Sequence, residues 1–365
     1  MKLLFFIIAF CLISFRFYLS WSGKDRESRG VSESYMKVKS GDFTEEIKYS
    51  GKFQLSDDET RFKTISPGGY FKYSKNNVYV KAESNLRGEI DYTITDGGNK
   101  LTMDDQGKIL VAEAVKEMIA WGFDADGRME RVYQRGGAQA LLSEVDSMKT
   151  DQVKSIYLSR LFAVDTIATD LPVITKKIGS MGSDMDKVRF LTKINPEQLK
   201  NPQTADVYFE IVDGLNSDME KLNALRYFIN QDSVSEKISF KILSETASLN
   251  SDMDKSNFYQ IMIDKGLIQG PLIDNLVENA SKLNADIDKS NVYKKIINAS
   301  GMSESQWILL IDKISNMSSD MDKSNMLVLV AEKMPKTEPL KASYRKTAKS
   351  LNNDMDYGRA MRALE

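Results

Sequence analysis

The sequence predicts an α+β chain, in which an N-terminal antiparallel β-sheet domain is followed by an α-helical solenoid of 34-residue helix-pair repeats. One observation is a recurring Ser-Asp-Met-Asp-Lys motif, since a fixed period of this length is typical of stacked supersecondary units. The other is a stretch over residues 47–55 in which apolar and polar residues alternate, as they do in a half-buried strand. The leading aspartates of the motif are 34 residues apart: Asp184, Asp218, Asp252, Asp286, Asp320 and Asp354.

Residues 1–22 predict an export signal or a signal anchor. Lys2 precedes a mostly apolar run, Leu3–Phe15, and the small residues Ser20 and Ser22 follow, which is the layout of a secretory signal. The apolar run is short for a membrane span, yet with only Arg16 interrupting it the segment could also persist as an anchor. In both cases we expect an extracytoplasmic protein, periplasmic or in the cell envelope, which contacts the membrane only through this segment if it stays uncleaved.

Residues 23–40 are charged and poor in large apolar side chains, so they predict a solvated linker. An antiparallel β domain is expected over residues 41–103, with strands over 47–55, 61–65, 70–74, 78–83 and 88–95. Pro67-Gly68-Gly69 is interpreted as a turn and not as a phosphate loop, because no helix follows it. Short strands joined by tight turns predict a meander that is solvated on one face.

Residues 104–149 predict a helical junction. A helix capped by Asp104 or Asp105 should end at Gly122, and a short helix should then lead to Gly136-Gly137 and a further helix. That further helix is followed by a corner at Asp151, which lies 33 residues before the first full motif. A degenerate unit therefore begins the array, as expected of a solenoid end.

Residues 150–365 predict the solenoid, in which each unit is a pair of antiparallel helices with one apolar stripe each. The motif forms the corner between units: Ser251 is the N-cap of a helix, and Asp254 at its third position completes a capping box. Both acids of the motif face the positive end of the helix dipole. We therefore assign a structural capping role to the motif residues Ser183, Asp184, Asp186, Ser217, Asp218, Glu220, Ser251, Asp252, Asp254, Asp286, Asp288, Ser319, Asp320 and Asp322.

Composition limits the chemistry. The chain has no histidine, which excludes His-based catalytic triads and His-ligated zinc. A net charge of −2 gives no reason to expect nucleic acid. The stretch from Asp252 resembles the opening of a calcium loop, but Asn257 and Ile263 stand where that loop requires Gly and Glu. We therefore expect no catalytic residue, no cofactor and no metal.

The repeated acids, from Asp184 and Asp186 to Asp354 and Asp356, should follow one edge of the array. This edge is either solvated and partly neutralised by neighbouring lysines, or a linear docking strip for a basic partner. The repeated methionines are expected to pack in the core: Met185, Met219, Met253, Met321 and Met355.

Helical positions at which the units differ predict a recognition surface, because solenoids bind through such faces. Several of these residues are apolar, which favours a protein partner in the cell envelope. The alternative is that they pack on neighbouring helices. The candidate partner-binding residues are Arg226, Tyr227, Gln260, Ile261, Lys294, Lys295, Val328 and Leu329, with Thr192 and Lys193 at the same positions of an earlier unit.

Two resemblances accompany these patterns. The helix pairs are similar in geometry to tetratricopeptide and HEAT repeats, although the Trp, Leu-Gly, Tyr and Pro signature of the former is missing. The run from Ile47 through Pro67-Gly68-Gly69, Arg135-Gly136-Gly137 and the Ser-Asp-x-Asp-Lys units resembles an extracytoplasmic region of bacterial envelope proteins. Some of those proteins carry it behind a membrane zinc peptidase of the β-lactam-sensor type. The resemblance implies a sensing or regulatory module without the peptidase, whose His-Glu-x-x-His motif cannot occur here.

We therefore expect a non-enzymatic, extracytoplasmic interaction or sensory module that binds a protein or envelope ligand through the solenoid face. The alternative from another class is an envelope hydrolase that uses Asp and Glu carboxylates only. One deep cleft with converging acids would indicate the hydrolase, and a long open face would indicate the binder.

Overall fold

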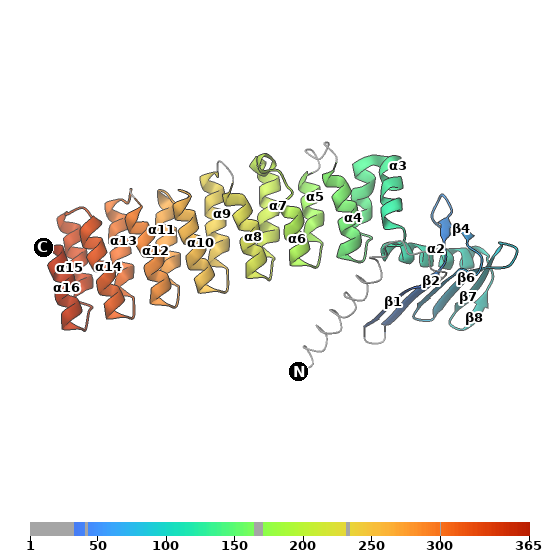
Figure 1. The fold of residues 1–365 in the computed structure, drawn as a ribbon, viewed down its shortest axis with the longest axis horizontal. Coiled ribbons are helices and arrows are strands. Elements are labelled where there is room, and N and C mark those ends of the chain that lie inside the picture. The colour runs from blue at the N-terminus through green and yellow to red at the C-terminus, as the bar shows by residue number, and fades with distance from the viewer. Residues whose placement is uncertain (1–32, 41–42, 164–170, 231–233, 300) are drawn as a thin grey trace, which may run out of the picture. The chain divides into compact units, whose positions relative to one another are not determined.

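The computed structural model describes residues 33–40, 43–163, 171–230, 234–299 and 301–365. The predicted signal segment, with Cys11, lies outside these ranges. An antiparallel β-sheet is followed by an array of helices, which confirms the predicted α+β class (Figure 1). The chain divides into two compact units between Phe123 and Asp124.

The first unit contains a six-stranded antiparallel sheet of order β1-β2-β5-β6-β7-β8 and a separate hairpin of β3 and β4. Residues 33–40, predicted as part of the charged linker, form edge strand β1, which pairs with β2 along its whole length. Charged side chains are well tolerated on an edge strand. The strands are β1 (Glu33–Ser40), β2 (Phe43–Ser50), β3 (Phe53–Leu55), β4 (Phe62–Ile65), β5 (Tyr70–Lys75), β6 (Val78–Ser84), β7 (Ile90–Asp96) and β8 (Asn99–Leu101).

Two glycines set the breaks between neighbouring strands. Residues 47–55 were predicted as one strand, but Gly51 adopts a φ of 105° and separates β2 from β3. The segment before β5 is a turn, as predicted, because the Gly69 N–H donates to the Ser66 carbonyl at 2.8 Å. A Cβ at Gly69 would lie 2.9 Å from the backbone oxygen of Ser50, so only glycine fits there.

The core of the first unit lies between the sheet and helix α2 (Asp105–Ala120). The strand register aligns Ile47, Tyr73, Val80 and Ile94 across four strands, and all four are buried. Asp104 caps α2 by accepting the N–H groups of Gln106 and Gly107.

The second unit begins with α3 (Ala125–Val145), which is kinked at Gly137, where φ is 62° and ψ is −153°. Two layers of parallel helices follow, and Figure 1 shows them side by side in a row. The first helix of each repeat, here called an A helix, packs on other A helices, as α12 does on α10 and α14. The second helix, called a B helix, packs on other B helices, as α13 does on α11 and α15.

The A helices are α4 (Asp151–Phe162), α6 (Asp184–Leu191), α8 (Asp218–Ile229), α10 (Asp252–Asp264), α12 (Asp286–Asn298), α14 (Asp320–Lys333) and α16 (Asp354–Leu364). The B helices are α5 (Leu171–Gly179), α7 (Pro202–Asp213), α9 (Glu236–Ala247), α11 (Pro271–Ser281), α13 (Glu304–Ser315) and α15 (Glu338–Ala348), with a short 3-10 helix, η2 (Pro196–Lys200), before α7. Among the helices described, none combines the length and the apolar character that crossing a membrane would require.

Both predicted apolar stripes are buried between the layers. In the repeat that starts at Asp252, the A helix buries Phe258, Tyr259 and Met262, and the B helix buries Leu276 and Ala280. Buried tyrosines also join a B helix to the following A helix by hydrogen bonds to backbone carbonyls. Tyr208 Oη donates to Ala224 at 3.0 Å and Tyr344 Oη to Ala360 at 2.8 Å.

Candidate functional site

The serines of the repeated motif lie at the N-termini of the A helices. Ser183, Ser217, Ser251 and Ser319 each accept the backbone N–H of the third residue that follows, at 3.2 to 3.3 Å. This is the hydrogen bond of an N-cap. Asn353 makes the equivalent cap in α16, whereas Ala285 of α12 has no side-chain cap.

The leading aspartates before Asp354 have a role that the sequence did not reveal, because each of them binds the backbone of the next corner. Asp218 Oδ2 accepts the N–H groups of Asn250 at 2.7 Å and Ser251 at 3.0 Å. The capping box predicted at Ser251 is therefore wrong: the serine N–H that Asp254 should bind is taken by an aspartate 33 residues earlier. Contacts of the same kind run from Asp151, Asp184, Asp252, Asp286 and Asp320.

In Asp252 these hydrogen bonds favour the ionised carboxylate. The backbone N–H of Asn284 holds the pKa of Asp252 below its ordinary value, and the Lys255 ammonium at 3.1 Å acts in the same direction. The carboxylates of these aspartates thus bond one repeat to the next. In the described ranges no three His, Cys, Asp or Glu side chains are grouped so that they could hold a metal ion.

The repeated methionines are exposed, so the prediction that they pack in the core is wrong. Met253 is 62% exposed and follows the leading aspartate directly. At 100° per residue, it lies half a turn around the helix from the buried Met262. We call the six equivalent residues, which are 59–82% exposed, the Met row: Met185, Met219, Met253, Ile287, Met321 and Met355.

A second repeated residue lies on the same outer face, four positions after the Met row. Asn257 is exposed one helical turn after Met253. The side chains of these asparagines make no hydrogen bond within the part of the chain that the structure describes. We call the four residues the Asn row: Asn223, Asn257 and Asn325, which are exposed, and Asn291, which is half-buried. Asn257 ends the repeated motif in the sequence, after a serine that recurs as Ser290 and Ser324, but we assigned no role to it.

The second acids of the motif border this face. Asp186 and Asp356 pair with Arg189 and Arg359 at 2.9 and 3.3 Å, and Glu220 is buried. The carboxylates of Asp254, Asp288 and Asp322 have no hydrogen-bond or ion-pair partner among the described residues. Three carboxylates that form no ion pair among the described residues therefore lie beside the Asn row in consecutive repeats.

The predicted partner-binding residues all lie on the A helices, eight and nine positions after the leading aspartate. Arg226 and Lys294 are exposed, as predicted, and Gln260, Ile261, Val328 and Leu329 are half-buried. Two of the candidates contact the preceding unit instead of facing solvent freely. Tyr227 Oη donates to the Ile194 carbonyl at 2.6 Å, and Lys295 pairs with Asp264 at 2.7 Å.

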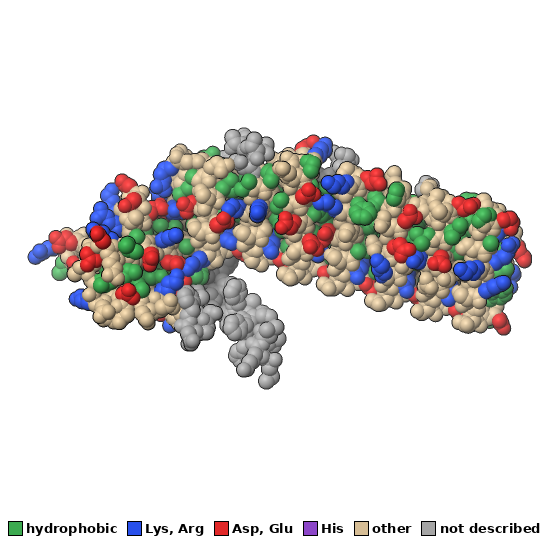
Figure 2. All heavy atoms as spheres, turned by 180° about the vertical axis from the view of Figure 1, so that it is seen from behind, with side chains coloured by type: hydrophobic (Ala, Val, Ile, Leu, Met, Phe, Trp, Pro, Cys, Tyr) green, Lys and Arg blue, Asp and Glu red, His purple; other side chains and the backbone are tan. Residues whose placement is uncertain are grey.

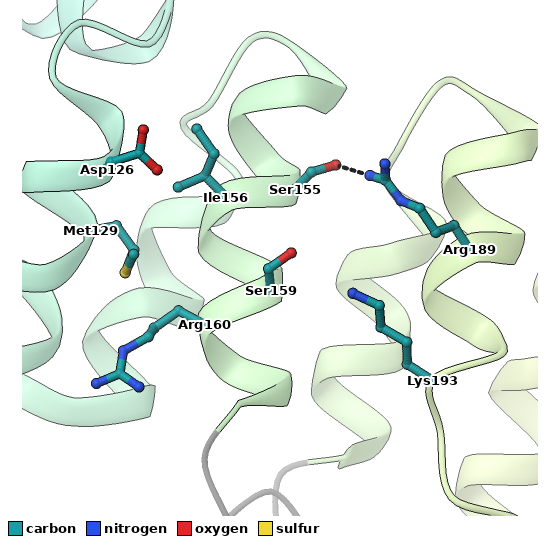
Figure 3. A pocket seen from close by; sticks show the side chains of 8 residues that line it. All are labelled: Asp126, Met129, Ser155, Ile156, Ser159, Arg160, Arg189 and Lys193. Carbon is teal, nitrogen blue, oxygen red and sulfur yellow. Dashed lines mark hydrogen bonds between the residues drawn. The ribbon is translucent and has the colours of Figure 1, made fainter.

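A hollow of about 530 Å³ lies on this face among α3, α4 and α6 (Figure 3). Two of the cationic side chains that line it have partners within the protein. Arg189 donates to Ser155 at 2.7 Å, and Arg160 pairs with Glu130 at 3.1 Å. Catalysis by paired carboxylates needs two acids facing one substrate, and Asp126 is the one acid among the eight lining residues. The lining residues are Asp126, Met129, Ser155, Ile156, Ser159, Arg160, Arg189 and Lys193.

Figure 2 shows that side chains of both charges are interspersed with apolar ones along the visible face of the array. No protein-family model and no curated protein matches the chain. The resemblance to envelope regions attached to zinc peptidases therefore rests on the sequence motifs alone.

Proposed function

We propose that the helical array is a non-catalytic interaction module that binds a protein partner along the outer face of its A helices. The observation that carries this proposal is the Met row, which places one large exposed apolar side chain on every repeat from α6 to α16. The proposed setting is the cell envelope, which rests on the signal-like residues 1–22.

The chemistry of the Met row supports a protein partner. Scattered exposed apolar residues are normal, but an ordered set on one face is typical of an interaction site. Methionine is flexible and polarizable, so it adapts to the surface of a partner. The exposed Arg226 and Lys294 on the same face add polar contacts that can select among partners.

Affinity capture with full-length protein tests the proposal. One variant carries Met219→Glu, Met253→Glu and Met321→Glu. The matched control carries the same change at exposed apolar residues of B helices, Val173→Glu, Phe240→Glu and Ile308→Glu. Both variants alter exposed positions and should fold like the wild type, since surface substitutions usually change stability by about 0.5 kcal/mol or less.

We expect that the wild type and the B-helix variant retain envelope proteins that the Met-row variant does not retain. Equal retention by all three proteins, or loss confined to the B-helix variant, would contradict binding through the A helices. Circular dichroism of each variant verifies that the helical content is unchanged.

A further inference from the structure

We infer that the A-helix face takes its partner as an extended polypeptide segment that carries Lys or Arg at intervals of about three residues. This inference rests on the proposed function and specifies the chemistry of the ligand. It is drawn from the second acids, the Met row and the Asn row, which are repeated without a side-chain bond inside the central repeats.

The other repeated residues of the motif have internal roles. The leading aspartates bind the next corner, and four of the lysines three positions later pair with them, as Lys289 does with Asp286 at 3.2 Å, whereas Lys221 pairs with Glu245 at 3.9 Å. Ser256 donates to the Asp288 carbonyl at 3.1 Å and Ser324 to the Asp356 carbonyl at 3.0 Å. Packing therefore explains these repeated residues but leaves the exposed ones without a function.

The Asn row has the chemistry to bind a main chain. Each carboxamide presents one acceptor oxygen and two N–H donors, which match the N–H and carbonyl of a peptide group. Asparagine is also a poor residue for an exposed helix interior, less favourable than alanine by roughly 0.6 kcal/mol. Its presence at Asn223, Asn257, Asn291 and Asn325 is thus a cost to each helix that a bound main chain would offset.

The second acids select the side chains of the partner. Asp254, Asp288 and Asp322 each lie three residues before a member of the Asn row and therefore on the same side of the helix. Their carboxylates form no ion pair among the described residues, so a basic side chain of the partner can pair with them. Lys and Arg also carry apolar stems that can lie on the neighbouring methionine of each repeat.

The spacing of the repeats fits an extended segment. Neighbouring packed helices lie about 8–10 Å apart, and an extended chain of the polyproline type has three residues per turn and rises about 3.1 Å per residue. Three residues of such a chain therefore match one repeat. A helical ligand fits less well, because its backbone N–H and carbonyl groups are already bonded within the helix and cannot bind the carboxamides.

Fluorescence anisotropy with full-length protein and labelled 15-residue peptides tests the inference. The probe is five copies of Lys-Ser-Ala. One comparison peptide has the same composition with the lysines in one block, and another is N-methylated at every third main-chain nitrogen. The protein variants are Asn257→Ala/Asn291→Ala/Asn325→Ala and the B-helix variant described above.

We expect the wild type and the B-helix variant to bind the regular peptide. Both comparison peptides should bind at least tenfold more weakly. The triple Asn variant should lose about a hundredfold, since each lost hydrogen bond contributes about fivefold. This variant should melt at the same or a higher temperature, because alanine favours the helix, so unfolding cannot explain the loss.

Three results would overturn the inference: equal binding of the regular and blocked peptides, unchanged affinity of the triple Asn variant, or no binding of the regular peptide. If the Met-row variant still loses its captured partner in the last case, the proposed function stands and only the extended basic ligand is wrong. Self-association that disappears in the triple Asn variant would assign the face to a second copy of this chain and would also overturn the inference.

Discussion

The leading aspartate of a repeat should contribute more to stability than the second acid of the same corner. Asp252 accepts hydrogen bonds from the backbone N–H and the side-chain amide of Asn284 at 2.8 and 2.7 Å, and its side chain is 17% exposed. Hydrogen bonds to a charged group contribute about 1.5–3 kcal/mol, part of which water replaces because Asn284 is exposed. Asp252→Ala should therefore lower the free energy of unfolding by about 2 kcal/mol.

Asp254→Ala is the matched control, because it removes the same charge from the same helix. The Asp254 carboxylate has no bonded partner among the described residues, so its loss removes only the interaction with the helix dipole, about 0.3–1 kcal/mol. Urea denaturation of both full-length variants, followed by circular dichroism at about 222 nm, where helical peptide groups absorb, gives the two losses. Amide hydrogen exchange at Asn284 should accelerate only in Asp252→Ala.

Equal losses in the two variants, within about 0.5 kcal/mol, would refute the conclusion that Asp252 ties one repeat to the next. That result would reduce the motif to a pair of acids at a helix N-terminus. Unchanged exchange at Asn284 in Asp252→Ala would lead to the same conclusion.

Three further predictions concern named residues. The pKa of Asp252 is lowered from 3.8 by its bond to the Asn284 N–H. Its contribution to the free energy of unfolding is therefore complete above pH 3.8 and is lost as the pH falls through the lowered pKa. In urea titrations at a series of pH values, Asp252→Asn should reduce the dependence of stability on pH in the acid range. Met253→Ser should change the free energy of unfolding by less than about 0.5 kcal/mol, whereas Met262→Ala should lower it by about 2–5 kcal/mol. Similar urea midpoints for the two variants would argue against an exposed Met row. Gly137→Ala should cost about 1–3 kcal/mol, because the φ and ψ of the α3 kink suit only glycine, and an unchanged thermal melt would show that the kink is not required.

The array could be predicted because its signal is local and repeated. The stripe that includes Phe258, Tyr259 and Met262 recurs in each unit, and its period alone identifies the buried face of a helix. The exposure of Met253 was also encoded in that period, since it lies opposite Met262, but the apolar character of methionine was given more weight than its helical phase. Hydrophobicity is thus a weaker guide than position once the helix is known.

Contacts between distant residues were out of reach. The bond from Asp218 to the corner at Ser251 joins groups 33 residues apart, and no local pattern separates this aspartate from an ordinary residue of the first helical turn. Strand β1 was missed for a related reason, because residues 33–40 are held by backbone pairing with β2, which a charged composition does not reveal. The Asn row was visible in the sequence, but its position on the same face as the Met row became clear only from the fold.

The joints between repeats limit how such an array can change in length. Because Asp218 binds the N–H groups of Asn250 and of the residue after it, excision of residues 251–284 would place Ala285 next to Asn250 and still provide both donors. The 33-residue step from Asp151 to Asp184 keeps the same bond, as the 34-residue units do. Unequal recombination between copies can therefore shorten or lengthen this protein by whole units, and each remaining joint keeps its hydrogen bonds.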